Sequence, residues 1–189
     1  MIIKAADLSN ASSIFEAFFD GVKAQAEKLS QAIDVFRNDA SFKERFKSAG
    51  YEAARNYMGV YITALKKLNT VCDAIVNNII SANNSIISAM SGYTEIDLSK
   101  KAEIETNLTQ LKTNLDNAYA EYNAAKEKKV KNYCQQTIQK LTADIAEVEK
   151  FLTIIKNTEA AYSSAKGLIG GEVSSTIQSY GTLIGNFCV

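Results

Sequence analysis

The 189-residue chain contains no proline, no histidine and no tryptophan. At an average usage of roughly 5%, about nine prolines would be expected. Proline breaks helix interiors, so its absence favours long, uninterrupted helices. Histidine is the commonest general base and metal ligand, and its absence argues against most hydrolase triads, zinc sites and carboxylate–histidine di-iron sites.

Cysteine is also scarce. Cys72, Cys134 and Cys188 are widely spaced and form no CxxC pair, which argues against zinc-binding and thioredoxin-like motifs. Cys72 and Cys134 fall at apolar positions of the helical patterns described below. We therefore expect reduced, buried thiols that pack as small hydrophobic side chains.

The chain has no net charge, no long apolar run and no secretory leader pattern. Lys+Arg and Asp+Glu both number 21, whereas nucleic-acid-binding proteins usually carry a basic excess, so we expect no nucleic-acid partner. No run of 18 apolar residues predicts a transmembrane helix. The opening "MIIKAADLSNASS" lacks a basic region followed by a long apolar core, so it does not predict a cleavable signal peptide.

The composition, 47% hydrophobic and 22% charged, is typical of a folded domain. Apolar residues recur at spacings of three and four along four segments, which predicts amphipathic helices. Each set is called a stripe below. The stripes are Phe15, Phe18, Val22, Ala26, Leu29, Ile33 and Phe36; Tyr51, Ala54, Met58, Tyr61, Leu65, Leu68, Cys72, Ile75, Ile79, Ala82, Ile86 and Ala89; Ile104, Leu108, Leu111, Leu115, Ala118, Tyr122 and Ala125; and Cys134, Ile138, Leu141, Ile145, Val148, Leu152, Ile155 and Tyr162.

The second stripe predicts a helix over residues 51–90 that is roughly 60 Å long. This exceeds the width of a compact domain of this size. We therefore expect an all-α fold, an elongated bundle of long antiparallel amphipathic helices, forming one domain over residues 1–189. Its order is a helix, an elbow, a long helix, a helical hairpin and a short C-terminal helix.

The ends of the helices are less sharply marked. Asp7 or Ser9 is a candidate cap for the first helix. In "SGYTEIDLS" (91–99), Gly92 is a candidate helix stop, and Asp97 or Ser99 a candidate cap for the next helix. The periodicity is lost around "KEKKVKN" (126–132), through either a tight turn or a stutter in one long helix. We favour the turn, because a hairpin buries the two flanking stripes against each other.

The last segment, residues 166–189, is rich in glycine and apolar residues and nearly free of charge. Small residues at such spacings let helices approach closely. We expect a short final helix that packs on the bundle. A segment that pairs with a partner or contacts a membrane, and the start of a linker, are the alternatives.

No nucleotide-binding or nucleophile motif is present, and most carboxylates lie off the stripes, where solvation is the default. We therefore predict no catalytic residues, no cofactor, no metal site and no enzymatic activity. The aromatic residues Phe15, Phe18, Phe19 and Phe36 are expected in the core rather than in a cofactor pocket. Asparagines crowd the second helix, where some are expected to set register and most to be exposed: Asn69, Asn77, Asn78, Asn83 and Asn84.

Adjacent apolar residues widen the stripes beyond what a thin bundle buries alone. Phe18 stands beside Phe19, and Tyr61 beside Ile62. Wide apolar faces on long helices are completed by partner helices in many complexes. The stripe width therefore predicts an interaction surface for other helical proteins.

The stretch "FKSAGYEAARNYM" (46–58) places a small-residue elbow before the long helix. This order resembles the LXG domain, the N-terminal domain of toxins exported by the type VIIb secretion system of Gram-positive bacteria. The family's Leu-x-Gly falls on Phe46, Lys47 and Ser48, with Phe in place of Leu and Ser in place of Gly. Gly50 stands two residues later. The two tyrosines and the basic residue of the following family pattern match Tyr51, Tyr57 and Arg55.

The resemblance implies a non-enzymatic targeting module. Such domains bind small helical proteins of the WXG type, and the complex presents an export signal to the secretion ATPase. A C-terminal toxin domain normally follows. The implied location is the cytoplasm before export and then the exterior, without a cleavable signal peptide. Partner contacts are expected at the elbow and the apolar faces: Phe18, Phe19, Phe46, Ser48, Gly50, Tyr51, Tyr57 and Tyr61.

The stretch "YTEID" matches the Tyr-x-x-x-Asp/Glu export signal of these systems through Tyr93 and Asp97. An ordinary loop with a helix cap explains the same residues. Two further functions stay open for the whole chain. One is a membrane-acting or pore-forming protein that inserts its glycine-rich tail, and the other is a self-associating structural coiled coil.

Overall fold

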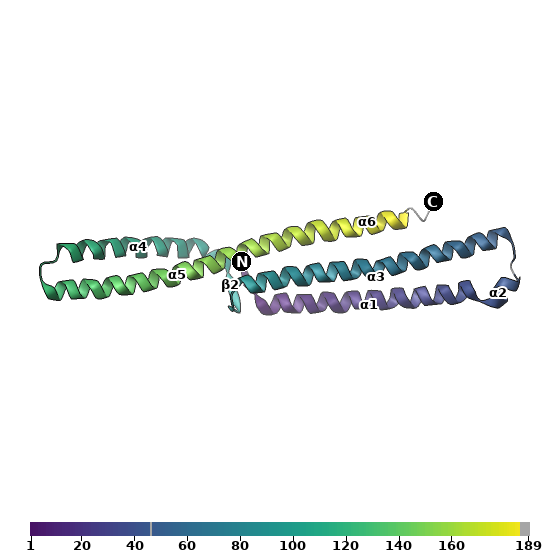
Figure 1. The fold of residues 1–189 in the computed structure, drawn as a ribbon, viewed down its shortest axis with the longest axis horizontal. Helices are drawn as coiled ribbons and strands as arrows, with labels where there is room; N and C mark the ends of the chain where they lie inside the picture. The colour runs from purple at the N-terminus through teal and green to yellow at the C-terminus, as the bar shows by residue number, and fades with distance from the viewer. Residues whose placement is uncertain (46, 186–189) are drawn as a thin grey trace. The chain divides into compact units, whose positions relative to one another are not determined.

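A computed structural model describes residues 1–45 and 47–185, and it confirms the all-α prediction (Figure 1). The expected order of helix, elbow, long helix, hairpin and short C-terminal helix is also confirmed. The helices are α1 (Ala5–Asn38), α2 (Ala40–Arg45), α3 (Ala49–Ala89), a 3₁₀ turn η1 (Leu98–Lys100), α4 (Lys101–Ala124), α5 (Lys128–Leu168), a π-helical segment η2 (Ile169–Val173) and α6 (Ser174–Gly185).

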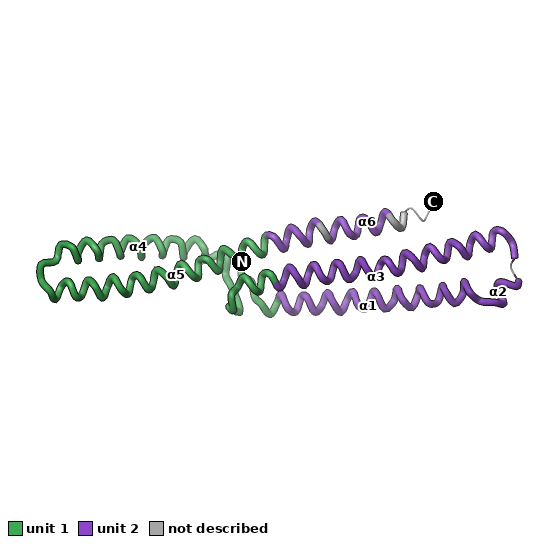
Figure 2. Tube along the Cα trace, in the orientation of Figure 1, with its two compact units in different colours: residues 1–7, 85–163 green, residues 8–84, 164–189 purple. Residues whose placement is uncertain are grey.

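The chain forms two compact units, which Figure 2 shows in different colours. Unit 1 comprises Met1–Asp7 and Ser85–Ser163, and unit 2 comprises Leu8–Asn84 and Ser164–Val189. The boundaries fall inside α1, α3 and α5, so each of these helices contributes to both units. The apolar periodicity continues across them and carries no signal for the division.

In unit 2, α1 and α3 lie side by side and antiparallel (Figure 1). The second stripe is buried as predicted at Cys72, Ile75 and Ile79, and the Cys72 thiol is free. Nearer the elbow, the buried positions are Ile62 and Ala64 rather than neighbouring stripe residues. A straight helix drifts against a strict seven-residue repeat, which explains this shift over so long a helix.

In unit 1, α4 and α5 form the favoured hairpin, so the tight-turn prediction for residues 126–132 is confirmed. Helix α4 ends at Ala124 and α5 begins at Lys128. The Ala125 N–H donates to the Glu121 carbonyl, and the Lys131 N–H donates to the Glu127 carbonyl. Ion pairs join the two helices in antiparallel register: Lys101–Glu159 at 2.5 Å, Lys156–Glu105 at 3.1 Å and Lys112–Glu149 at 2.7 Å.

A short β-ribbon, absent from the prediction, lies at the start of unit 1. Strand β1 (Ile2–Lys4) pairs antiparallel with β2 (Glu95–Asp97), with Ile3 opposite Ile96 and both side chains buried. The predicted cap at Asp7 or Ser9 is wrong, because α1 begins directly after β1, at Ala5. The Ala5 N–H donates to the Thr94 carbonyl at 3.0 Å, so the ribbon itself satisfies this helix end.

The turn after α3 is built as predicted around Gly92. Ser91 and Gly92 both have positive φ, 53° and 89°. A left-handed residue just past a helix end is the usual helix stop, and glycine adopts this conformation without strain. The preceding residue, Met90, is fully buried, so the turn is anchored in the core of unit 1.

Candidate interaction surface

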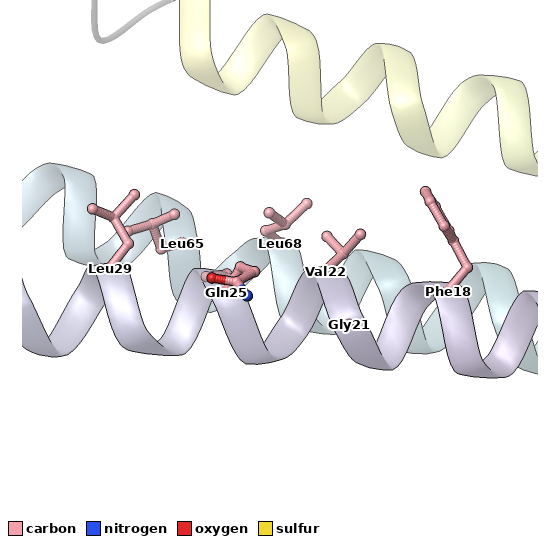
Figure 3. A pocket seen from close by; sticks show the side chains of 8 residues that line it. Phe18, Gly21, Val22, Gln25, Leu29, Leu65 and Leu68 are labelled. Atoms are coloured by element: carbon pink, nitrogen blue, oxygen red, sulfur yellow. The ribbon is translucent and has the colours of Figure 1, made fainter.

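An apolar groove runs along unit 2 between α1 and α3. Its volume is about 620 Å³. Figure 3 shows the side chains of Phe18, Val22 and Leu68 pointing out of the helix pair toward the same side. The lining residues are Phe18, Gly21, Val22, Gln25, Ala26, Leu29, Leu65 and Leu68. Apart from Gln25 the lining is apolar, so the groove suits an apolar side-chain row rather than a polar small molecule.

The first stripe is only half covered, which corrects the expectation that its aromatic residues form core. Phe15 is 44% exposed, Phe18 is 62% exposed and Leu29 is 52% exposed. Phe19 is partly buried and packs edge-on against the Phe18 ring, with centroids 5.2 Å apart. One long helix, α3, covers only one side of such a stripe, so the other side stays open.

Polar contacts fix α1 against α3 beside the groove. The Lys23 ammonium bridges Asp20 on its own helix, at 2.8 Å, and Asp73 on α3, at 2.7 Å. These hydrogen bonds raise the pKa of Lys23, the bond to Asp20 contributing most. The Lys23–Asp73 ion pair thus links α1 to α3.

Asn83 is the buried asparagine that sets the register of these helices. It is 6% exposed, and its amide nitrogen donates to the Leu8 carbonyl and to the Ser12 hydroxyl. A buried amide with partners on the facing helix permits one alignment and penalises others. The expectation that most of these asparagines are exposed is wrong, because only Asn77 and Asn84 are exposed, whereas Asn69 and Asn78 are half-buried.

The predicted elbow lies between α2, which ends at Arg45, and α3, which begins at Ala49. Ser48 caps α3. Its carbonyl and its hydroxyl both accept from the Tyr51 N–H, at 3.0 and 3.3 Å. Gly50 lies inside the first turn of α3, not at the break. Phe46 lies outside the described residues.

The basic residue of the elbow pattern, Arg55, joins the two sides of the elbow. It is largely buried, and its Nε donates to the Arg37 carbonyl in the last turn of α1 at 3.1 Å. A second contact, to Glu52 at 3.2 Å, orients the guanidinium along α3. A cation at a helix C-terminus satisfies a free carbonyl and complements the helix dipole.

The tyrosines of the predicted site differ in exposure. Tyr57 and Tyr61 are each 48% exposed, whereas Tyr51 is half-buried at the start of α3. Sequence reasoning expected Tyr61 on the buried stripe, but Ile62 takes that place. Exposed tyrosines combine an apolar ring with a polar tip and are common in interfaces.

The "YTEID" stretch lies in unit 1. The Tyr93 ring is 46% exposed and packs against Phe151, with centroids 5.2 Å apart. Asp97 ends β2 and caps η1, accepting from the hydroxyl and the N–H of Ser99 at 2.6 and 3.0 Å. These bonds, the hydroxyl first, lower the pKa of Asp97 below its ordinary value of 3.8. The cap predicted for Asp97 is thereby confirmed.

The glycine-rich tail continues α5 through η2 into α6. The Tyr180 hydroxyl donates to the Ala64 carbonyl on α3 at 3.3 Å. Burial raises the pKa of this phenol. In Figure 3 a helical segment of this region lies above the groove, yet it contributes none of the lining residues.

The described residues, 1–45 and 47–185, contain neither a candidate metal cluster nor a candidate membrane-spanning helix. No group of three or more His, Cys, Asp or Glu side chains among them is placed to hold a metal ion. No helix in this part of the chain combines the length and apolarity that crossing a membrane requires.

Comparison of the chain with protein-family models, with curated proteins and with solved structures gave no match. The surface is therefore interpreted from its own geometry. Sequence reasoning identified Phe18 through its apolar neighbour but did not single out Leu29, Leu65 or Leu68. All three stand in the stripes, and their partial exposure follows from which faces the other helices leave open.

Proposed function

We propose that this chain is a non-enzymatic targeting module that binds small helical proteins and directs a toxin to a type VIIb secretion system. The observation that carries the binding part is the open side of the first stripe, at Phe15, Phe18 and Leu29. The secretion system, its ATPase and the toxin cargo are supported by the resemblance of the elbow to the LXG pattern.

The groove favours an amphipathic helix as its occupant. Covering the exposed halves of Phe15, Phe18 and Leu29 contributes roughly 3 kcal/mol, since full burial of such a side chain contributes about 1.5–3 kcal/mol. A helix that carries apolar residues at i, i+3, i+4 and i+7 matches a groove between two long helices. Small proteins built from two amphipathic helices, as in the WXG type, present such faces.

The elbow supports the proposal because its contacts hold α1 against α3. Ser48 starts α3, and Arg55 caps the end of α1. A groove shared by two helices keeps its width only if the helices keep their alignment. Preorganisation of this kind lowers the cost of binding.

The test is co-expression of the chain with the small helical proteins encoded beside its gene, followed by size exclusion with light scattering. We expect a stable heterocomplex of fixed stoichiometry, one copy of the chain with one or two partners. A monomer whose gene neighbours do not bind would contradict the proposal. A homodimer without those proteins would instead support the self-associating alternative.

A further inference from the structure

Four lysines gather at the turn of the α4/α5 hairpin in unit 1. Lys126 lies in the turn, and Lys128, Lys129 and Lys131 occupy the first turn of α5. All four side chains are exposed. We call this set the lysine tip.

The lysine tip differs from three other lysines of the same hairpin. Lys101, Lys112 and Lys156 each pair with a carboxylate on the facing helix. Among the described residues, no carboxylate lies within ion-pair distance of a tip lysine. Lys131 stands over the Tyr122 ring instead, with its ammonium 5.6 Å from the ring centroid. The tip is thus a cluster of lysines that make no ion pair, and its charge is positive overall.

The position of the lysine tip strengthens its positive potential. The first turn of α5 contains no acidic residue, although helix N-termini favour acidic side chains because the helix dipole is positive there. Glu121 and Glu127 are the nearby carboxylates. At 1.5 Å per residue, Asp116 lies roughly 13 Å from the turn along α4 and Asp144 roughly 20 Å from Lys131 along α5. Both exceed the Debye length of about 10 Å at moderate salt.

Exposed apolar side chains accompany the lysines. Val130 is 43% exposed and Tyr133 is 70% exposed. They stand three residues apart on α5, so they share a face, and Lys129 lies one turn before Tyr133. Lysines reach the headgroup layer while valine and tyrosine side chains enter the boundary beneath it, which is the composition of interfacial membrane contacts.

We propose that the lysine tip docks on the surface of an anionic membrane. The contact is peripheral and reversible, and it is independent of the partner-binding function proposed for unit 2. The tip lies at the end of the α4/α5 hairpin (Figure 1), and the charge of its lysines complements that of an anionic lipid surface. Each lysine near an anionic surface strengthens binding roughly fivefold.

The experiment is co-sedimentation of the full chain with vesicles of phosphatidylcholine mixed with phosphatidylglycerol, and with vesicles of phosphatidylcholine alone. We expect binding to the acidic vesicles that weakens as salt is raised. The double variant Lys128→Gln/Lys129→Gln should bind them on the order of 20-fold more weakly. The matched control is Lys66→Gln/Lys67→Gln on α3, which removes the same charge from exposed positions in unit 2.

Three results would overturn the proposal. The first is no binding of the unaltered chain to the acidic vesicles. The second is equal loss of binding in the tip variant and in the control, which would indicate non-specific charge attraction. The third is a further variant, Val130→Ser/Tyr133→Ser, that loses no binding at raised salt, where the apolar contacts should dominate. Circular dichroism of all variants should match the unaltered chain, because every substituted side chain is exposed.

Discussion

The hydroxyl of Ser48 caps the start of α3, one of the two helices that line the groove. The side chain accepts from the Tyr51 N–H, one of the donors that a helix N-terminus leaves without an intrahelical partner. Serine is one of the residues preferred at a helix N-cap, because its hydroxyl accepts from such a donor.

Replacing Ser48 with alanine should lower the free energy of unfolding by about 1 kcal/mol, because the Tyr51 donor loses its side-chain acceptor. Urea unfolding followed by circular dichroism measures the change. Ser13→Ala is the control, since the Ser13 hydroxyl bonds only to a carbonyl within its own helix, the Ser9 carbonyl. Ser48→Asp should retain most of the stability. Equal stability of the two alanine variants would show that the Ser48 hydroxyl does not cap α3.

Asn83→Ala should lower the free energy of unfolding by roughly 1–3 kcal/mol. The buried Asn83 amide donates to both the Leu8 carbonyl and the Ser12 hydroxyl, and the variant loses both hydrogen bonds. Asn84→Ala, one position further along the same helix but exposed, should change stability by less than about 0.5 kcal/mol. Parallel urea titrations of the two variants make the comparison. A neutral Asn83→Ala would show that this amide does not set the register.

At the scale of elements, the four stripes predict α1, α3 and the α4/α5 hairpin, whereas α2 was not predicted. Apolar spacing of three and four reports which face of a helix is buried, and it does so locally along the chain. The α4/α5 turn followed from a loss of phase between two such stripes. Gly92 was recognisable because few residues adopt positive φ.

The β-ribbon and the contact between Arg55 and the Arg37 carbonyl were not predicted, and the reason is the same for both. Ile3 pairs with Ile96, and Arg55 bonds to the Arg37 carbonyl, so each depends on a partner distant in sequence. A three-residue strand also has too few positions to show alternation. The exposure of Phe18 and Leu29 was not predicted for a related reason. Periodicity shows which residues share a helix face, but it does not show which other helices cover that face.

The helix α3 can be tested by comparing a core substitution with one at its start. Ile75→Asp places a carboxylate at a position that is 4% exposed, so it should lower the free energy of unfolding by several kcal/mol. Gly50→Pro should cost only about 1 kcal/mol, because proline is tolerated in the first turn of a helix. Thermal melts of both variants measure the difference, and the melting temperature of Ile75→Asp should be the lower of the two. Equal melting temperatures would contradict the assignment of these two positions.

At the scale of the whole molecule, the two proposals fall on different compact units. The groove at Phe18 and Leu29 belongs to unit 2, and the lysine tip belongs to unit 1. Variants in one unit therefore serve as controls for the function proposed for the other. Helix α6 contacts α3 through Tyr180, whereas the residues that line the groove come from α1 and α3.

The central claim is that the open side of the first stripe binds a helical partner. The most direct measurement is the affinity of the double variant Phe18→Asp/Leu29→Asp for a co-purified partner, beside Val130→Asp as an exposed apolar control in unit 1. We predict a loss on the order of 100-fold for the double variant, the scale of an interface hot spot, and no change for the control. Unchanged affinity in the double variant, with its helicity intact, would contradict the account.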